Sequence, residues 1–147
     1  MHKKILVGLD GSKHGIEAAQ EAVTLAKNFD AELHLLTVTR PYKVSPKLRQ
    51  FLEAENLLGE PKYVLDEMTN NIVSAAKELA TKAGVKNVYS VIREGKPART
   101  LLEYAKGNGI DLIVVGARGV GELEAALLGS VSQKVSMLST CSVMIVR

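Results

Sequence analysis

Two glycine-rich segments in the C-terminal third of the chain have the residue types of an anion-binding site. The segment from Gly116 to Gly121 reads Gly-Ala-Arg-Gly-Val-Gly, and the segment from Gly129 to Ser132 reads Gly-Ser-Val-Ser. Glycine lets backbone N–H groups approach a phosphate closely, and a helix that starts at Ser130 adds unpaired N–H donors and the positive end of its dipole. The two segments together predict one phosphate site, although the same glycines would also serve in plain turns.

Side chains near these segments suggest how such a site would work. The hydroxyls of Ser130 and Ser132 can donate hydrogen bonds to phosphate oxygens. Arg118 either neutralises phosphate charge or is a solvated arginine. Asp10, which follows the first apolar run, would repel a phosphate unless it accepts a ribose hydroxyl or binds Mg²⁺, and the alternative is a plain carboxylate at a helix start.

The two familiar phosphate-binding fingerprints are absent from this sequence. The P-loop pattern G-x4-G-K-[ST] does not occur, and the first apolar run is followed by Gly8-Leu9-Asp10-Gly11 instead of G-x-G-x-x-G. Neither a P-loop nucleoside triphosphatase nor a dinucleotide-binding Rossmann protein is therefore expected.

Short aliphatic runs predict the strands that position these residues. Runs of strand length without polar interruption are typical of parallel strands buried on both faces. A fifth segment, Asn87–Arg93, alternates in polarity and is expected near a sheet edge. The four buried strands are predicted at Ile5–Val7 extended by Leu9, Leu33–Val38, Leu112–Val115 and Val143–Val146.

Amphipathic segments lie between these runs. Apolar residues at three- and four-residue spacing, with Ser12 as a candidate N-cap for the first of them, predict helices. Strands and helices then alternate along the chain, which indicates a doubly wound α/β fold with ligands at the carboxyl ends of the strands. The helices are predicted at Ser12–Asn28, Val64–Ala83, Pro97–Lys106 and Ser130–Leu138.

Composition limits the class of protein. The 147 residues are expected to form one domain, with an insertion at about 39–62 that contains a short helix within 45–58. Because 46% of residues are hydrophobic but only 4% are aromatic, base-stacking surfaces for nucleic acid are not expected. A net charge of +3, one cysteine (Cys141) and no membrane-length apolar run predict a cytoplasmic protein without nucleic-acid or membrane partners.

The spacing Gly116-x2-Gly119-x9-Gly129-Ser130 resembles the G-x2-G-x9-G-[ST] motif of the ATP-binding branch of the universal stress protein family. The resemblance extends over the whole chain: the first strand ends in Asp-x-Ser at Asp10 and Ser12, and Gly95-x-Pro97 precedes the third helix. Ser142 departs from the family, which usually has proline there, and this bears on dimer geometry more than on ATP binding.

The resemblance implies a fold, a ligand and an assembly. The fold would be flavodoxin-like, similar to the adenine nucleotide alpha hydrolases, with five parallel strands in the order 3-2-1-4-5 and helices on both faces. ATP, with Mg²⁺ bridging its phosphates, would lie at the carboxyl ends of the strands, and the last strand would form a homodimer. The implied nucleotide-binding residues are Asp10, Ser12, Val38, Gly116, Arg118, Gly119, Gly129, Ser130, Val131 and Ser132.

The sequence shows no group of residues suited to catalysis. His2, His14 and His34 are isolated in sequence, and His34 is expected to be an ordinary sheet histidine. Phosphoryl transfer needs a residue that orients the attacking group. We therefore expect a regulatory protein that couples ATP occupancy to its dimer or partner state. The alternative is a slow Mg²⁺-dependent ATPase, or a transferase that uses ATP, at the same loop.

Overall fold

A computed structural model describes residues 2–40, 47, 50, 61–121 and 128–147 of the chain. The short helix predicted within 45–58 lies outside these residues except at Lys47 and Gln50. The fold is described from the remaining elements.

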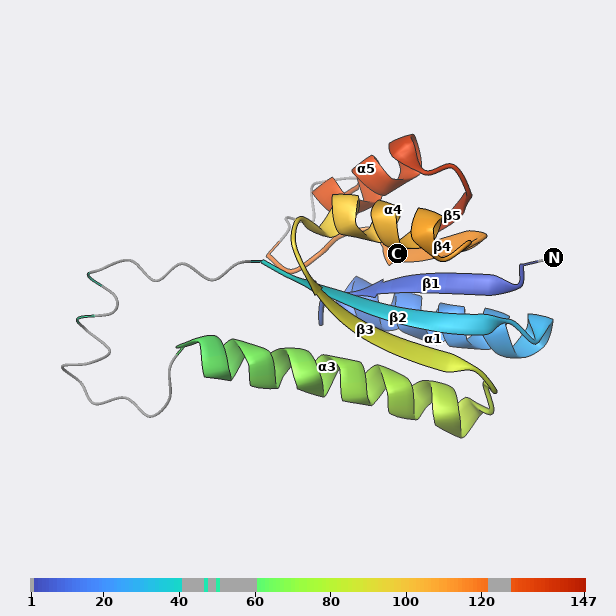
Figure 1. The fold of residues 1–147 in the computed structure, drawn as a ribbon, viewed down its shortest axis with the longest axis horizontal. Coiled ribbons are helices and arrows are strands. Elements are labelled where there is room, and N and C mark those ends of the chain that lie inside the picture. The colour runs from blue at the N-terminus through green and yellow to red at the C-terminus, as the bar shows by residue number, and fades with distance from the viewer. Residues whose placement is uncertain (1, 41–46, 48–49, 51–60, 122–127) are drawn as a thin grey trace.

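The structure confirms the predicted doubly wound sheet. Its five strands are all parallel and lie in the order β3-β2-β1-β4-β5, which puts β1 at the centre and β3 and β5 at the edges. All strands therefore end at the same side of the sheet (Figure 1). The strands are β1 (Lys4–Leu9), β2 (Glu32–Thr39), β3 (Val88–Glu94), β4 (Leu112–Gly116) and β5 (Ser142–Val146).

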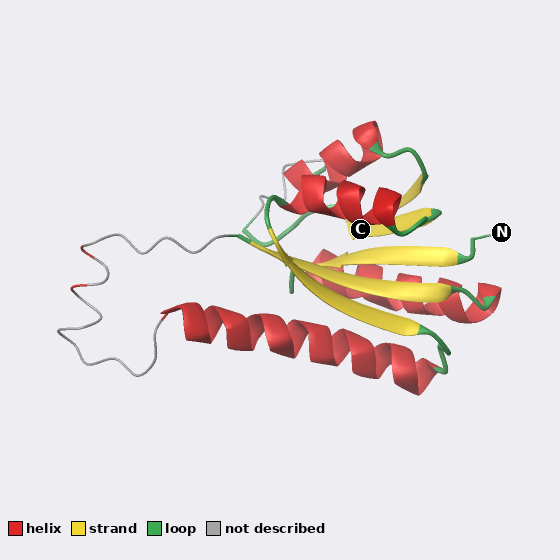
Figure 2. Ribbon diagram, in the orientation of Figure 1, coloured by secondary structure: helices red, strands yellow, loops and turns green. Residues whose placement is uncertain are grey.

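Helices cover both faces of this sheet, as Figure 2 shows. Helices α1 and α3 pack on one face, and α4 and α5 pack on the other. None of the described helices is long and apolar enough to cross a membrane. The helices are α1 (Lys13–Phe29), α3 (Pro61–Ala83), α4 (Pro97–Gly107) and α5 (Ser130–Leu138).

Alternation along the central strands divides the core in two. In β1, the fully buried Ile5 and Val7 face α1 and α3, whereas Leu6 faces α4 and α5. Burying each such side chain contributes about 1.5–3 kcal/mol. Edge strand β3 is mostly exposed, with Tyr89 and Ile92 open to solvent, which agrees with the edge position predicted from its mixed polarity. Cys141 is half-buried against the α4–α5 side of the core.

Local sequence explains where the first two long helices begin. The Ser12 hydroxyl accepts a hydrogen bond from the Gly15 N–H at 3.0 Å, so Ser12 is the N-cap that was predicted for α1. Helix α3 begins at Pro61, earlier than the predicted Val64. Proline has a fixed φ and lacks an N–H, so it suits the first helical position, and the apolar spacing alone did not reveal this start.

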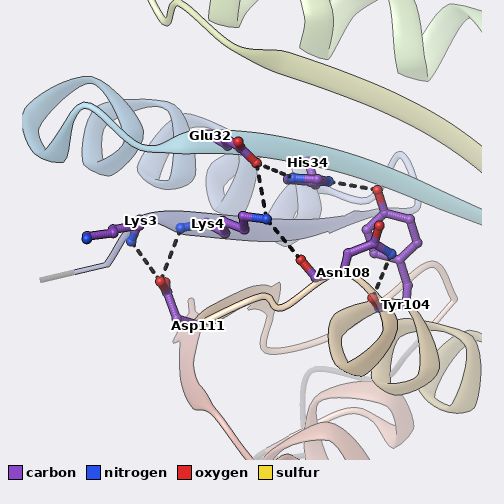
Figure 3. Close-up of polar contacts among 7 residues, drawn as sticks. All are labelled: Lys3, Lys4, Glu32, His34, Tyr104, Asn108 and Asp111. Carbon is purple, nitrogen blue, oxygen red and sulfur yellow. Dashed lines mark hydrogen bonds and ion pairs between the residues drawn. The ribbon is translucent and has the colours of Figure 1, made fainter.

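Polar contacts fix the opposite end of the sheet, where the strands begin (Figure 3). The Asp111 carboxylate accepts the Lys3 and Lys4 N–H groups, and buried His34 lies between Glu32 and Tyr104. Because the Glu32 carboxylate only accepts, His34 Nε2 carries a proton, and in the neutral imidazole Nδ1 then accepts from the Tyr104 hydroxyl at 2.7 Å. This series of hydrogen bonds attaches α4 to β2. His34 therefore has a structural role in the sheet, as predicted.

The Tyr104 hydroxyl should ionise at higher pH than an ordinary tyrosine. Burial raises its pKa, and the nearby Glu32 carboxylate adds to this while Arg93 opposes it. A raised pKa in the folded state means that the neutral hydroxyl stabilises the fold below pH about 10, and that this stabilisation is lost as pH rises through the folded pKa. In a spectrophotometric titration, Tyr104→Phe should remove the latest step. The exposed Tyr89→Phe should retain it, and identical curves for both variants would refute the assignment.

Candidate functional site

A cleft of about 190 Å³ lies where β1, β2 and β4 end and where α1 and α5 begin. This is the side of a doubly wound sheet on which ligands bind. Backbone and small side chains form most of its wall. The lining residues are Gly8, Leu9, Asp10, Gly15, Leu36, Val38, Arg40, Pro97, Leu101, Val115, Gly116, Ala117, Arg118, Gly119, Val120, Gly129, Ser130, Val131 and Ser132.

The backbone of Ala117 joins the two glycine segments. Its carbonyl accepts hydrogen bonds from the Gly129 N–H at 2.6 Å and from the Ser132 hydroxyl at 2.7 Å. Its N–H donates to the Val146 carbonyl of β5 at 2.7 Å. The backbone of one residue therefore fixes the N-terminus of α5 against the end of β4 and connects both to the last strand.

Asp10 is oriented by Ser12. One carboxylate oxygen of Asp10, Oδ1, accepts hydrogen bonds from the Ser12 N–H at 2.9 Å and from the Ser12 hydroxyl. The same hydroxyl caps α1 through the Gly15 N–H, so the single Ser12 hydroxyl both orients Asp10 and begins the helix. Asp10 is exposed at the cleft wall, and its other oxygen, Oδ2, has no hydrogen bond to any residue that the structure describes.

Gly116 is needed for close packing between β4 and α1. A Cβ added there would lie 2.7 Å from the His14 carbonyl carbon, 2.8 Å from the His14 Cβ and 2.9 Å from the Gly15 nitrogen. Two of these are backbone atoms, which cannot rotate away. Gly15 is crowded in turn, because a Cβ there would lie 2.5 Å from Asp10 Oδ1. Glycines at both positions bring the start of α1 against the end of β4.

His14 contacts Arg118 through both ring nitrogens. The Arg118 N–H lies 3.3 Å from Nδ1, and a guanidinium nitrogen lies 3.2 Å from Nε2. Both partners are donors. A neutral imidazole has one acceptor nitrogen, and an imidazolium has none, so at most one of the two contacts is a hydrogen bond. The half-buried Arg118 side chain is thus held at the cleft without a carboxylate partner among the described residues.

Aliphatic side chains line the other part of the cleft. Leu36 and Val115 are buried on the α4–α5 side of the sheet, and Leu101 of α4 packs with them. Val38, near the end of β2, is half-buried beside this group. The cleft therefore has an apolar part at β2 and α4 and a part rich in backbone N–H groups and hydroxyls at the glycine segments.

Comparison with known proteins identifies the family. A model of the universal stress protein family matches residues 1–147. The chain belongs to this family. Universal stress protein YxiE of Bacillus subtilis (strain 168) is 40% identical over 154 residues, with all of both chains covered.

Solved universal stress proteins also share the fold. The structure of universal stress protein UspA from Lactobacillus plantarum matches with a TM-score of 0.73 and 31% identity, over 99% of this chain and 98% of that one. A universal stress protein in complex with cAMP matches with a TM-score of 0.70 and 28% identity, over 99% of this chain and 97% of that one. A member of the family at this level of similarity thus holds an adenine nucleotide.

The structure of this universal stress protein gathers the predicted site residues in one cleft, with the exception of Ser12. Ser12 does not line the cleft, and its hydroxyl holds Asp10. The Ser132 hydroxyl, predicted to donate to phosphate, donates to Ala117 here and is 1% exposed. Sequence reasoning missed His14, Gly15 and the Ala117 carbonyl. A signal for the first two was their place in the first turn of a helix that follows a central strand.

Proposed function

We propose that this universal stress protein is a regulatory protein that binds ATP in the cleft. The observation that carries the proposal is the set of hydrogen bonds made by the Ala117 backbone, which we call the Ala117 junction. It holds the two glycine segments and the N-terminus of α5 around one cleft. The N-terminus of a helix with adjoining backbone N–H groups favours phosphate. The family membership and the cAMP complex of a relative support an adenine nucleotide as the ligand.

The proposed pose follows the two parts of the cleft. Adenine lies in the apolar part, with the backbone at Val38 meeting its edge, and the ribose reaches Asp10, whose Oδ2 is available to accept a hydroxyl hydrogen bond. The phosphates lie at Gly119, Gly129, Ser130 and Val131, and Arg118 turns toward them. In this pose Ser12, Gly116 and Ser132 act by shaping the site.

Mg²⁺ would be held mainly by the phosphates. Asp10 is the one carboxylate among the described lining residues, and no group of three or more His, Cys, Asp or Glu in the described part of the chain could hold a metal ion. Mg²⁺ commonly binds through one or two carboxylates together with substrate phosphates. The donor set of the cleft fits that arrangement and does not fit a metal cage made by protein alone.

We further propose that nucleotide occupancy is coupled to a homodimer formed through β5. This strand is an edge of the sheet with half-buried aliphatic residues, and edge strands have backbone groups that can pair with a second chain. The Ala117 N–H donates to the Val146 carbonyl, so a shift of the glycine segments acts directly on β5. Sedimentation with and without ATP tests this, and a monomer under both conditions at micromolar protein would contradict it.

Calorimetry decides whether ATP is the ligand. We expect ATP to bind with the stoichiometry of one site per chain, and adenosine to bind more weakly because it lacks phosphates. No binding at millimolar ATP would overturn the proposal.

The competing function, a Mg²⁺-dependent ATPase or transferase, predicts instead that bound ATP turns over and that changing Asp10 abolishes this turnover. Recovery of unhydrolysed ATP from the complex would argue against it.

Arg118→Ala should weaken ATP binding selectively. Loss of one partly exposed, charge-assisted hydrogen bond to a phosphate is expected to cost about 1–2 kcal/mol of binding free energy. Adenosine binding should not change, because Arg118 faces the phosphates in the proposed pose. Lys77→Ala, which removes a cation on α3 that does not line the cleft, is the control. Equal losses for ATP and adenosine would show that Arg118 acts only on the structure of the loop.

A further inference from the structure

A second cavity adjoins the cleft on its α4–α5 side. This groove measures about 880 Å³, against about 190 Å³ for the cleft itself. Small-molecule pockets usually measure roughly 300–1,000 Å³, so the groove has room for a further group beside a nucleotide held in the cleft. The two cavities share the lining residues Arg40, Pro97, Ser130 and Val131.

Basic side chains dominate the charge of the groove. Arg99 is paired with Glu103 at 2.8 Å, but Lys96 and Lys134 have no ion pair with any described carboxylate. An excess of unpaired cations around one cavity attracts an anionic ligand. The charged lining residues are Arg40, Lys96, Arg99, Lys134 and Glu103.

The groove also has aliphatic side chains in its lining, with which a phosphate chain alone makes no favourable contact. Leu102 of α4 and Val131 of α5 are half-buried in it, and Leu138 at the end of α5 is 65% exposed. Covering such side chains with the flat face of a base is favourable. The groove therefore combines attraction for phosphate with a surface for an apolar ring.

Ser130 indicates which part of a bound ligand would lie where the two cavities meet. It lies on the wall of both cavities at the N-terminus of α5, where the proposed function puts the phosphates. A group attached to the far end of that phosphate chain would therefore enter the groove between α4 and α5.

We propose that this protein binds dinucleoside polyphosphates, with one adenosine in the cleft, the phosphate chain at Ser130 and the second nucleoside in the groove. The proposal rests on the proposed function, because the first nucleotide occupies the same cleft. Lys96 and Lys134 then contact the phosphate chain, and Leu102 and Leu138 lie against the second base. The second nucleoside adds affinity that the phosphates alone do not supply.

The test compares two ligands with the same number of phosphates. Diadenosine tetraphosphate carries a second nucleoside and adenosine tetraphosphate does not. By calorimetry on the full chain we expect the first to bind roughly tenfold more tightly, since a second base is buried against aliphatic side chains. Equal affinities would overturn the proposal while leaving ATP binding intact. Failure of ATP and both tetraphosphates to bind would overturn the proposed function as well.

Matched variants locate the preference in the groove. Leu138→Asn should abolish the preference for the dinucleotide, whereas Met137→Asn should keep it, because Met137 is similarly exposed on α5 but does not line the groove. Lys134→Glu should weaken both tetraphosphates by roughly three- to tenfold and leave adenosine binding unchanged, while Lys77→Glu should change neither. A preference that survives Leu138→Asn would refute the assignment of the second nucleoside to this groove.

Discussion

Gly116→Ala is expected to lower the free energy of unfolding by about 1–3 kcal/mol, the usual cost of adding a carbon to a closely packed site. The new Cβ would lie within 2.7–2.9 Å of His14 and Gly15. Because backbone atoms of α1 are involved, the helix has to move away from the end of β4. Gly15 and Gly116 both line the cleft, so the same movement should weaken ATP binding.

Urea unfolding and ATP titration of one variant measure both effects. Gly107→Ala, at the end of α4, is the control because a Cβ added there meets nothing within 4 Å. Replacing a helical glycine without strain should stabilise the protein by about 0.5–1 kcal/mol. Similar unfolding free energies for the two variants would show that α1 is not held against β4 as tightly as the contact distances indicate.

The strands and most helix boundaries were predictable because their causes are local. Aliphatic runs such as Leu112–Val115 are buried on both faces inside the parallel sheet, and Ser12 caps α1 through a residue three positions along. The run at Val143–Val146 was wrongly predicted as a buried strand, because it forms the edge strand β5 and is only half-buried. The mixed polarity of residues 87–93 indicated an edge strand, because polar side chains are tolerated where a strand is open to solvent. Strand order in the sheet followed from the family resemblance and not from any local pattern.

The roles of individual site residues were harder to predict because their partners are distant in sequence. Gly116 was interpreted as a residue that lets phosphate approach, but the contact that excludes a side chain comes from His14 on another element. His14 was considered isolated, yet it lies against Arg118, 104 residues away. Sequence identifies which residue types are available, and only the packing of α1 on β4 decides which of them meet.

The backbone hydrogen bonds of Ala117 link the cleft to the edge strand β5. The Ala117 carbonyl is bonded to the second glycine segment and its N–H to β5, so the position of α5, the shape of the cleft and the edge strand are not independent. A ligand that draws the Gly129 N–H toward a phosphate competes with the Ala117 carbonyl for that donor. This competition is a physical route by which occupancy could reach β5 in the proposed regulatory function.

Ser132→Ala is therefore expected to lower the free energy of unfolding of the nucleotide-free protein by about 1–2 kcal/mol, the usual cost of losing one buried hydrogen bond. Ser132 is 1% exposed, and its hydroxyl donates to Ala117, a residue 15 positions earlier in the chain. The Gly129 N–H would remain as a donor to the same carbonyl, which limits the loss.

Ser136→Ala on the same helix is the matched control for this experiment. The Ser136 hydroxyl donates to the carbonyl of Gln133, three residues earlier, as Ser132 also does toward Gly129. Ser136 is exposed, however, and its hydroxyl makes no hydrogen bond to Ala117. Its replacement should be neutral or slightly stabilising, because alanine favours helix more than serine does. If the Ser132 hydroxyl instead donated directly to phosphate, Ser132→Ala would weaken ATP binding and leave the unfolding free energy of the nucleotide-free protein equal to that of Ser136→Ala. Urea unfolding without nucleotide, followed by ATP titration of both variants, separates a hydroxyl that builds the site from one that contacts the ligand.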